Sequence, residues 1–360
     1  MILYRGQDLT SLFLKIPKSL TFDEKILLKE YYSKHERGSF EEIINKEKIL
    51  PFAACVLTHI GCDKEYWTRK HDLYLERNRK IKSIVDGVFL EMKTVGSETL
   101  TLAENYGVVL LSNSCLGCFC SGDVDLYADP SEKEIIIKCL TDMGFIYENR
   151  SGRVTNYSEQ VSMFFNPNKL NDGFWINILW TTTSRAFLIQ EKYNERLAKE
   201  RISAKQIDNS NIRVLSETSL MYFCALHIAS GHYYTLSPGL RLYVDIDRLA
   251  RAVNIDWDLI LKWVDEDEAG IRVQIVMYIA HKLFKTPIPS KVFKKIFNSR
   301  RNRIFINYLL KSDTMRIQSK SSRLKRLYVE LASDDNSLFI SILKRLRYYL
   351  KMHYQLRTSM

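Results

Sequence analysis

Residues 121–127 read Ser121-Gly122-Asp123-Val124-Asp125-Leu126-Tyr127, and the fold is most readily predicted from them. The alternation after a turn-forming Ser-Gly pair indicates a short strand. Side chains two residues apart on a strand point to the same face, so Asp123 and Asp125 would present two carboxylates side by side. Such like charges repel unless a cation joins them, and Mg²⁺ prefers oxygen ligands. The segment therefore predicts a magnesium site, with a simple turn as the alternative.

A loop of small and polar residues precedes this strand. The apolar run at 108–111 predicts a buried strand, and the residues between it and Asp123 are rich in Ser, Cys and Gly. Backbone amides in such a turn can form an anion-binding nest, and nearby hydroxyl and amide side chains can add donors. We therefore expect this loop to bind phosphate groups. The residues expected to make these contacts are Ser112, Asn113, Ser114 and Gly122.

One helix and three strands are predicted after residue 130. Ser131 to Met143 has helical spacing, with Ser131 and Glu134 placed as a capping box and Gly144 placed to end the helix. Patterns of aromatic and β-branched residues predict strands at 145–147, 161–165 and 174–180. Residues 96–185 are therefore expected to form an α/β core with a small mixed sheet.

Helical patterns flank this core on both sides. Residues 1–95 are predicted to be mostly helical, with a long amphipathic helix over 63–93. Residues 186–360 are predicted to form a helical C-terminal domain. The helices expected there cover 219–230, 245–253, 256–264, 271–284, 290–310 and 338–354. The predicted fold class is therefore α+β, with helical regions on either side of a mixed-sheet core.

The order of these features resembles that of the polymerase-β-like nucleotidyltransferase superfamily. There a Gly-Ser pair lies before an Asp-x-Asp strand; here Ser112 takes the serine place, while Leu111 stands where the glycine would be. Four later blocks, beginning at Leu220, Arg241, Ile255 and Leu283, are similar in order and type to the bacterial family of uncharacterised nucleotidyltransferases. The resemblance covers about residues 95–290.

This resemblance implies transfer of a nucleoside monophosphate from a nucleoside triphosphate, with ATP as the expected donor, to a hydroxyl-bearing acceptor. Asp123 and Asp125 would hold Mg²⁺, in a cleft between the sheet and the helices after residue 215. The superfamily usually supplies a third acid from a later strand, but Asn177 occupies that position. Asn177 could be a weakened ligand, or Asp172 or Glu159 could replace the acid. Otherwise the protein is a nucleotide- or partner-binding module without turnover.

Other polar residues have simpler interpretations. His227 and His232 are five residues apart, unlike a helical metal pair, and are interpreted as structural. Asp245 and Asp247 lie near Arg241 and Arg248, and they could either face substrate or form local ion pairs.

Three loop cysteines also need an interpretation. Cys115, Cys118 and Cys120 suggest a metal, but zinc needs four ligands and no second pair is evident. We therefore interpret these cysteines as small buried loop residues.

Amino-acid composition also indicates in which compartment the protein works and what it could bind. The seven cysteines lack the spacing of a disulfide framework, and no long apolar run or signal peptide is apparent, so we expect a cytoplasmic protein with neither a membrane nor a disulfide-linked partner. Residues 282–360 contain 19 Lys and Arg but 4 Asp and Glu, whereas the whole chain carries +11. This basic region could attract RNA, although a solvated helical surface has the same composition.

Overall fold

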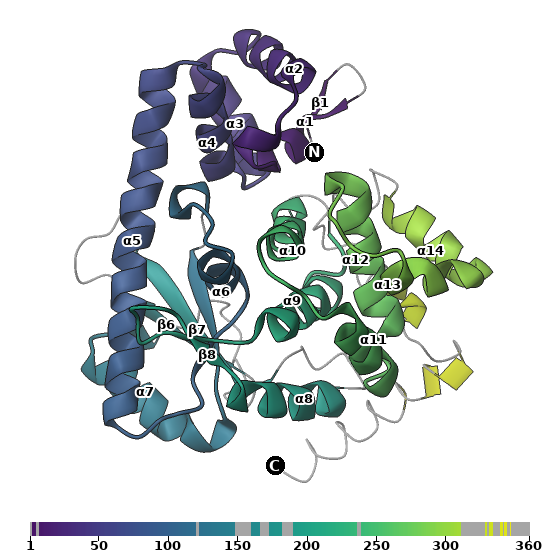
Figure 1. Cartoon of the computed structure of the whole chain (residues 1–360). Helices are drawn as coiled ribbons and strands as arrows, with labels where there is room; N and C mark the ends of the chain where they lie inside the picture. Colours follow the sequence, from purple (N-terminus) through teal and green to yellow (C-terminus); the bar gives the residue numbers. More distant parts are fainter. Residues whose placement is uncertain are drawn as a thin grey trace.

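The computed structural model describes residues 2–4, 7–119, 122–147, 160–165, 173–181, 190–235 and 239–310, with some positions between 328 and 346. Over these residues a seven-stranded mixed sheet is surrounded by helices from both ends of the chain (Figure 1). The predicted α+β class is therefore confirmed.

The N-terminal region is helical, as predicted. Thr21 caps the second helix with a complete capping box, in which the Glu24 side chain accepts from the Thr21 amide. A two-stranded hairpin, β1 (Leu3–Tyr4) and β2 (Gln7–Asp8), precedes these helices. The helices are α1 (Leu9–Leu14), α2 (Phe22–Ser33), α3 (Arg37–Lys46) and α4 (Leu50–Ile60).

A single long helix, α5 (Lys64–Thr94), connects this region to the sheet. It packs against α4 near its start and against α7 (Lys133–Asp142) near its other end (Figure 1). From Asn78 onward the buried side chains recur about every three to four residues, which is the spacing of one helical face. They are Trp67, Asn78, Ile81, Val85, Val88, Phe89 and Met92.

The sheet brings the predicted site residues onto neighbouring strands. Its order is β5-β6-β7-β4-β3-β9-β8, and β4 runs parallel to β7 and antiparallel to β3. In this register Asp125 lies opposite Asn177. The strands are β3 (Thr101–Leu102), β4 (Asp123–Tyr127), β5 (Ile146–Tyr147), β6 (Gln160–Phe165), β7 (Phe174–Leu179), β8 (Lys205–Gln206) and β9 (Arg213–Val214).

The prediction of a strand at 108–111 was wrong. These residues end helix α6 (Glu104–Leu111), and the strand beside β4 is β3 instead. Val108 and Val109 are almost completely buried, and α6 contacts β4, α9 and α10. A short apolar run suits a buried helix as well as a buried strand, so the pattern alone could not distinguish them.

The capping box at Ser131 was also wrong. A short 3₁₀ turn, Pro130–Glu132, precedes α7, and the Asp129 carboxylate accepts from the Ser131 amide. Pro130 suits the first position of such a turn because it has no amide hydrogen to satisfy. Gly144, with φ 90°, follows the end of α7 as predicted.

The C-terminal part is a group of helices packed against the sheet side that carries α6. The predicted helix at 290–310 is interrupted by a 3₁₀ turn at Lys295–Asn298, and the helix predicted at 338–354 lies largely outside the described residues. Among the described residues, none of the helices has both the length and the apolar character needed to cross a bilayer. The helices are α8 (Gln190–Ile202), α9 (Glu217–Ser230), α10 (Leu240–Ala252), α11 (Trp257–Glu266), α12 (Gly270–Phe284), α13 (Lys291–Lys294) and α14 (Arg300–Leu310).

Candidate functional site

The two aspartates and Asn177 form one hydrogen-bonded group on β4 and β7. Asn177 Nδ2 donates to Asp125 Oδ1 at 2.8 Å and to Asp123 Oδ2 at 3.5 Å. On the next strand, the Ser162 hydroxyl donates to Asn177 Oδ1 at 2.8 Å. The Asn177 amide therefore presents its N–H groups, rather than its oxygen, to the aspartates. Its proximity to them is as predicted.

A third carboxylate that sequence reasoning missed is Glu104, the first residue of α6. The Ala103 amide donates to the Asp125 carbonyl oxygen at 2.9 Å, which places Glu104 next to β4. Its side chain is buried and accepts from the Tyr127 hydroxyl at 3.3 Å. With φ 42°, Glu104 adopts a left-handed conformation that is costly for a residue with a Cβ. No sequence motif marks this glutamate, because the antiparallel pairing of β3 with β4 brings it there.

The neighbouring carboxylates perturb Asp125. Burial, together with the charges of Glu104 and Asp123, raises the pKa of Asp125 to about 7. The hydrogen bond from Asn177 acts in the opposite direction and favours the ionised form. A cation placed among these groups would relieve the repulsion. Asp123 and Asp125 therefore offer oxygen ligands of the kind that suit a hard divalent ion, and the charge of Glu104 acts on Asp125 from nearby.

His227 from α9 completes this group. Its Nδ1 lies 2.8 Å from Glu104 Oε1. The interpretation of His227 as a structural residue did not anticipate its place beside the carboxylates. Burial alone would lower the pKa of His227, but the carboxylate of Glu104 and those of the aspartate pair raise it. A raised pKa favours the imidazolium form, which supplies a positive charge beside the acids.

His232 lies next to His227 because the chain turns back after α9. The two rings are 4.6 Å apart. Burial and the neighbouring charges of His227 and Arg241 lower the pKa of His232 to about 3, while Asp123 acts in the opposite direction. His232 is therefore neutral at physiological pH and can donate or accept one hydrogen bond at the site.

The acidic residues of α10 have separate roles. Asp247 accepts from Arg251 at 2.9 Å and from the Thr286 hydroxyl at 2.8 Å, which confirms the local alternative for this residue. Asp245 instead is buried near Glu104 and His227, and burial raises its pKa to about 7 even though Arg248 opposes the shift. Asp245 therefore extends the ionisable group toward α10.

The loop predicted to bind phosphates follows a helix rather than a strand. The amides of Ser112, Asn113 and Ser114 all donate to carbonyls of α6, so they are not open to an anion. The Ser112 and Ser114 hydroxyls lie 2.7 Å apart. Phosphate contacts by these residues would therefore have to come from their side chains. Gly122 precedes Asp123, and its carbonyl accepts from the Trp175 amide.

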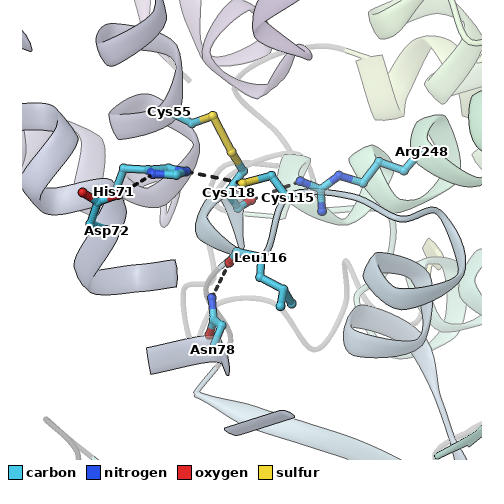
Figure 2. Close-up of a disulfide and its surroundings, with 8 residues drawn as sticks. All are labelled: Cys55, His71, Asp72, Asn78, Cys115, Leu116, Cys118 and Arg248. Atoms are coloured by element: carbon cyan, nitrogen blue, oxygen red, sulfur yellow. Dashed lines mark hydrogen bonds and ion pairs between the residues drawn. A yellow bond between two sulfur atoms is a disulfide. The ribbon is translucent and has the colours of Figure 1, made fainter. Parts of the chain in front are cut away.

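The interpretation of the loop cysteines as small buried residues was wrong for Cys115, which is exposed, whereas Cys118 is buried as predicted and also forms a disulfide with Cys55 of α4. The Cys115 sulfur lies 3.4 Å from Nε2 of His71 on α5 (Figure 2). Cys120 and the two suggested replacement acids, Asp172 and Glu159, lie outside the described residues. Sequence reasoning missed Cys55 and His71 because neither is near the loop along the chain.

Comparison with known proteins identifies a family but no close relative. A family model described as an uncharacterised nucleotidyltransferase matches residues 43–285, which is more than half of the chain and includes both aspartates, Asn177 and His227. No curated protein matches the chain, and no solved structure does.

Proposed function

The chain belongs to this uncharacterised nucleotidyltransferase family, and from that premise we propose that it transfers a nucleoside monophosphate from a nucleoside triphosphate, with ATP as the first candidate, to a hydroxyl group. In this reaction the acceptor oxygen forms a bond to the α-phosphorus while the bond from that phosphorus to the β-phosphate oxygen breaks. Pyrophosphate leaves, and the hydroxyl proton passes to a base. The mononucleotide is thereby joined to the acceptor through a phosphate ester.

The observation that carries the proposal is the convergence of Asp123, Asp125 and Glu104. Carboxylates placed so that their charges raise the pKa of a neighbour lower the stability of the protein unless a cation or a proton compensates. We propose that Mg²⁺ is that cation and that Asp123 and Asp125 hold it. When bound, Mg²⁺ would neutralise phosphate charge and help to orient the α-phosphate.

The remaining roles follow from the neighbours of each side chain. Asn177, fixed by Ser162, orients the two aspartates through its amide hydrogens. Glu104 takes the place of the third acid and receives the acceptor proton at a carboxylate oxygen. His227, whose Nδ1 contacts Oε1 of Glu104, holds this carboxylate in position and offsets its charge.

Two cations near His232 could supply positive charge for the triphosphate. Arg241 on α10 and Lys48 after α3 both act electrostatically on His232, as Asp123 does. We propose that these two cations contact the β- and γ-phosphates, with the side chains of Ser112, Asn113 and Ser114, and with Gly122, completing the phosphate site. A Lys or Arg contact would stabilise the pyrophosphate as it leaves.

Three wider assignments accompany this proposal. The Gly-Asp-x-Asp strand motif supports membership of the polymerase-β-like superfamily. The four free thiols, Cys62, Cys115, Cys139 and Cys224, support a cytoplasmic location, whereas the Cys55–Cys118 disulfide argues against it unless it is reduced in the cell. The basic residues after 282 support RNA as an acceptor or partner, because clustered Lys and Arg bind phosphate backbones with a strong dependence on salt.

Pyrophosphate release from each of the four nucleoside triphosphates tests the proposal. The assay uses the full chain with Mg²⁺ and a panel of hydroxyl-bearing acceptors that includes RNA, and Asp123→Ala and Asp125→Ala serve as inactive controls. Asp142→Asn, an exposed change on α7, should retain full activity. Release that persists in both aspartate variants would contradict the proposed roles.

A specific observation favours a second function, namely nucleotide or partner binding without turnover. Asn177 replaces a negative ligand and its amide hydrogens occupy both aspartates. Assays of the wild type beside Asn177→Asp, the variant that restores an acid, separate the two functions. If the protein is a binding module, wild type binds nucleotide without releasing pyrophosphate on any acceptor. If it is an enzyme, wild type turns over before any acid is restored.

A further inference from the structure

A second cluster of metal-ligating side chains lies away from the carboxylates, where the N-terminal helices meet the loop before β4. The sulfurs of Cys55 and Cys118 and a ring nitrogen of His71 all lie within 4.8 Å of one another. Cys115 is a fourth potential ligand, with its sulfur 3.4 Å from His71 Nε2. Figure 2 shows the imidazole of His71 directed from α5 toward the loop that carries Cys115 and Cys118.

The loop has the local geometry of a two-cysteine metal knuckle. Cys115-Leu116-Gly117-Cys118 places two cysteines three positions apart around a 3₁₀ turn. The Cys118 amide donates to the Cys115 carbonyl at 3.0 Å, and the amides of Gly117 and Cys118 also point to the Cys115 sulfur. A Cys-x-x-Cys loop joined by a second pair of Cys or His ligands is the usual pattern of a structural zinc site.

The surroundings hold these ligands in place. A Cβ added to Gly117 would lie less than 3 Å from three ring atoms of His71, so only glycine lets the ring approach the loop this closely. The other ring nitrogen, Nδ1, faces an Asp72 oxygen at 3.4 Å, an arrangement typical of a histidine that binds metal through Nε2. Asn78 Nδ2 donates to the carbonyls of Leu116 and Phe119, and Arg248 donates to that of Cys118.

We propose that Cys55, His71, Cys115 and Cys118 bind one Zn²⁺ that fixes the loop before β4 to helices α4 and α5. In a tetrahedral site with zinc–sulfur bonds of about 2.3 Å and zinc–nitrogen bonds of about 2.0 Å, ligand atoms lie about 3.5–3.8 Å apart. The separation of Cys115 and His71 is close to this value. The disulfide between Cys55 and Cys118 is the oxidised form of the same site.

The two forms are related by reduction. A phosphine reduces the disulfide to two thiols and itself becomes a phosphine oxide with an oxygen from water. Zn²⁺ then displaces the protons of these thiols and of Cys115, and Nε2 of His71 supplies the fourth ligand. Cys118 lies five residues before Asp123, the first residue of β4. A zinc ion bound at Cys118 would therefore also limit the movement of the chain that leads into β4. The zinc site does not depend on the proposed nucleotidyl transfer.

Zinc content and cobalt spectra of the full chain test this proposal. Protein reduced with a phosphine, incubated with Zn²⁺ and desalted should contain about one zinc per chain, and Co²⁺ in its place should give thiolate-to-metal charge-transfer bands. Cys118→Ser and His71→Ala should lose most of the metal, whereas Cys62→Ser and His59→Gln, which lie outside the cluster, should retain it. If a variant does not fold, the wild-type cobalt spectrum still decides. Reduced wild type that takes up no zinc, or metal binding that survives both ligand variants, would overturn the proposal.

Discussion

Replacing Asp125 by Asn should stabilise the metal-free protein, and the gain should depend on pH. Asn keeps the shape and the oxygen that accepts from Asn177 but removes the charge. Burial, with the charges of Glu104 and Asp123, raises the pKa of Asp125 from 3.8 to about 7 in the folded protein. The folded state therefore keeps a proton that the unfolded state loses, and wild-type stability falls as pH rises from about 4 to about 7.

The magnitude follows from the same values. At 1.36 kcal/mol per pKa unit, a rise from 3.8 to about 7 corresponds to a loss of about 4 kcal/mol above pH 7. The Asp125 carboxylate is partly exposed, so solvent screening reduces this to about 2 kcal/mol. Urea unfolding of wild type and Asp125→Asn with EDTA, at intervals between pH 5 and 8.5, measures the difference.

The two proteins should diverge as pH rises and then differ by a constant amount above about pH 7. The exposed change Asp142→Asn should show no such trend. Adding Mg²⁺ at pH 8 should stabilise wild type more than Asp125→Asn if Asp125 binds the ion. A difference that is independent of pH, or a wild type that is the more stable protein at pH 8.5, would refute the electrostatic reasoning.

Two further predictions concern stability alone. Asn78→Ala should lower the free energy of unfolding by about 2–3 kcal/mol, because it removes hydrogen bonds to two carbonyls and to the Tyr106 hydroxyl. The exposed control Ser83→Ala on the same helix should change it by less than about 0.5 kcal/mol. Equal effects of the two substitutions would show that the Asn78 hydrogen bonds do not stabilise the fold. Arg196→Ala should cost about 3 kcal/mol, because Asp267 is buried and would lose its ion pair. Lys192→Ala on the same helix removes an exposed ion pair and one bond to the Glu266 carbonyl, and should cost less. Chemical denaturation measures both, and a small loss for Arg196→Ala would mean that the Tyr222 hydroxyl alone satisfies Asp267.

Much of the fold could be predicted because its helices and strands have clear periodicity. The 31-residue helix α5 carries a repeating apolar face, and β4 alternates from Asp123 to Leu126. That alternation also placed Asp123 and Asp125 on one face, which is an inference from spacing along a single segment, the information that sequence patterns contain. Asn177 was expected near them only because the resemblance to the superfamily implies a third ligand from a later strand.

The rest depended on contacts between distant segments. Glu104 reaches the aspartates through the pairing of β3 with β4, and His227 reaches Glu104 from another helix. Cys55 and His71 meet the loop cysteines only when α4 and α5 pack against it. The short run at 108–111 satisfied the pattern of either a helix or a strand, and only its tertiary surroundings decided in favour of a helix.

Glu104 offers the most direct test of the central claim that three carboxylates form a nucleotidyl-transfer site. The measurement is Mg²⁺-dependent pyrophosphate release by wild type and Glu104→Gln with the acceptor that supports the fastest turnover. Gln keeps the size of the side chain and can still accept from Tyr127 and His227. The account predicts a loss of about 10²-fold or more in kcat, with nucleotide binding retained. Unchanged kcat in a folded Glu104→Gln variant would contradict it.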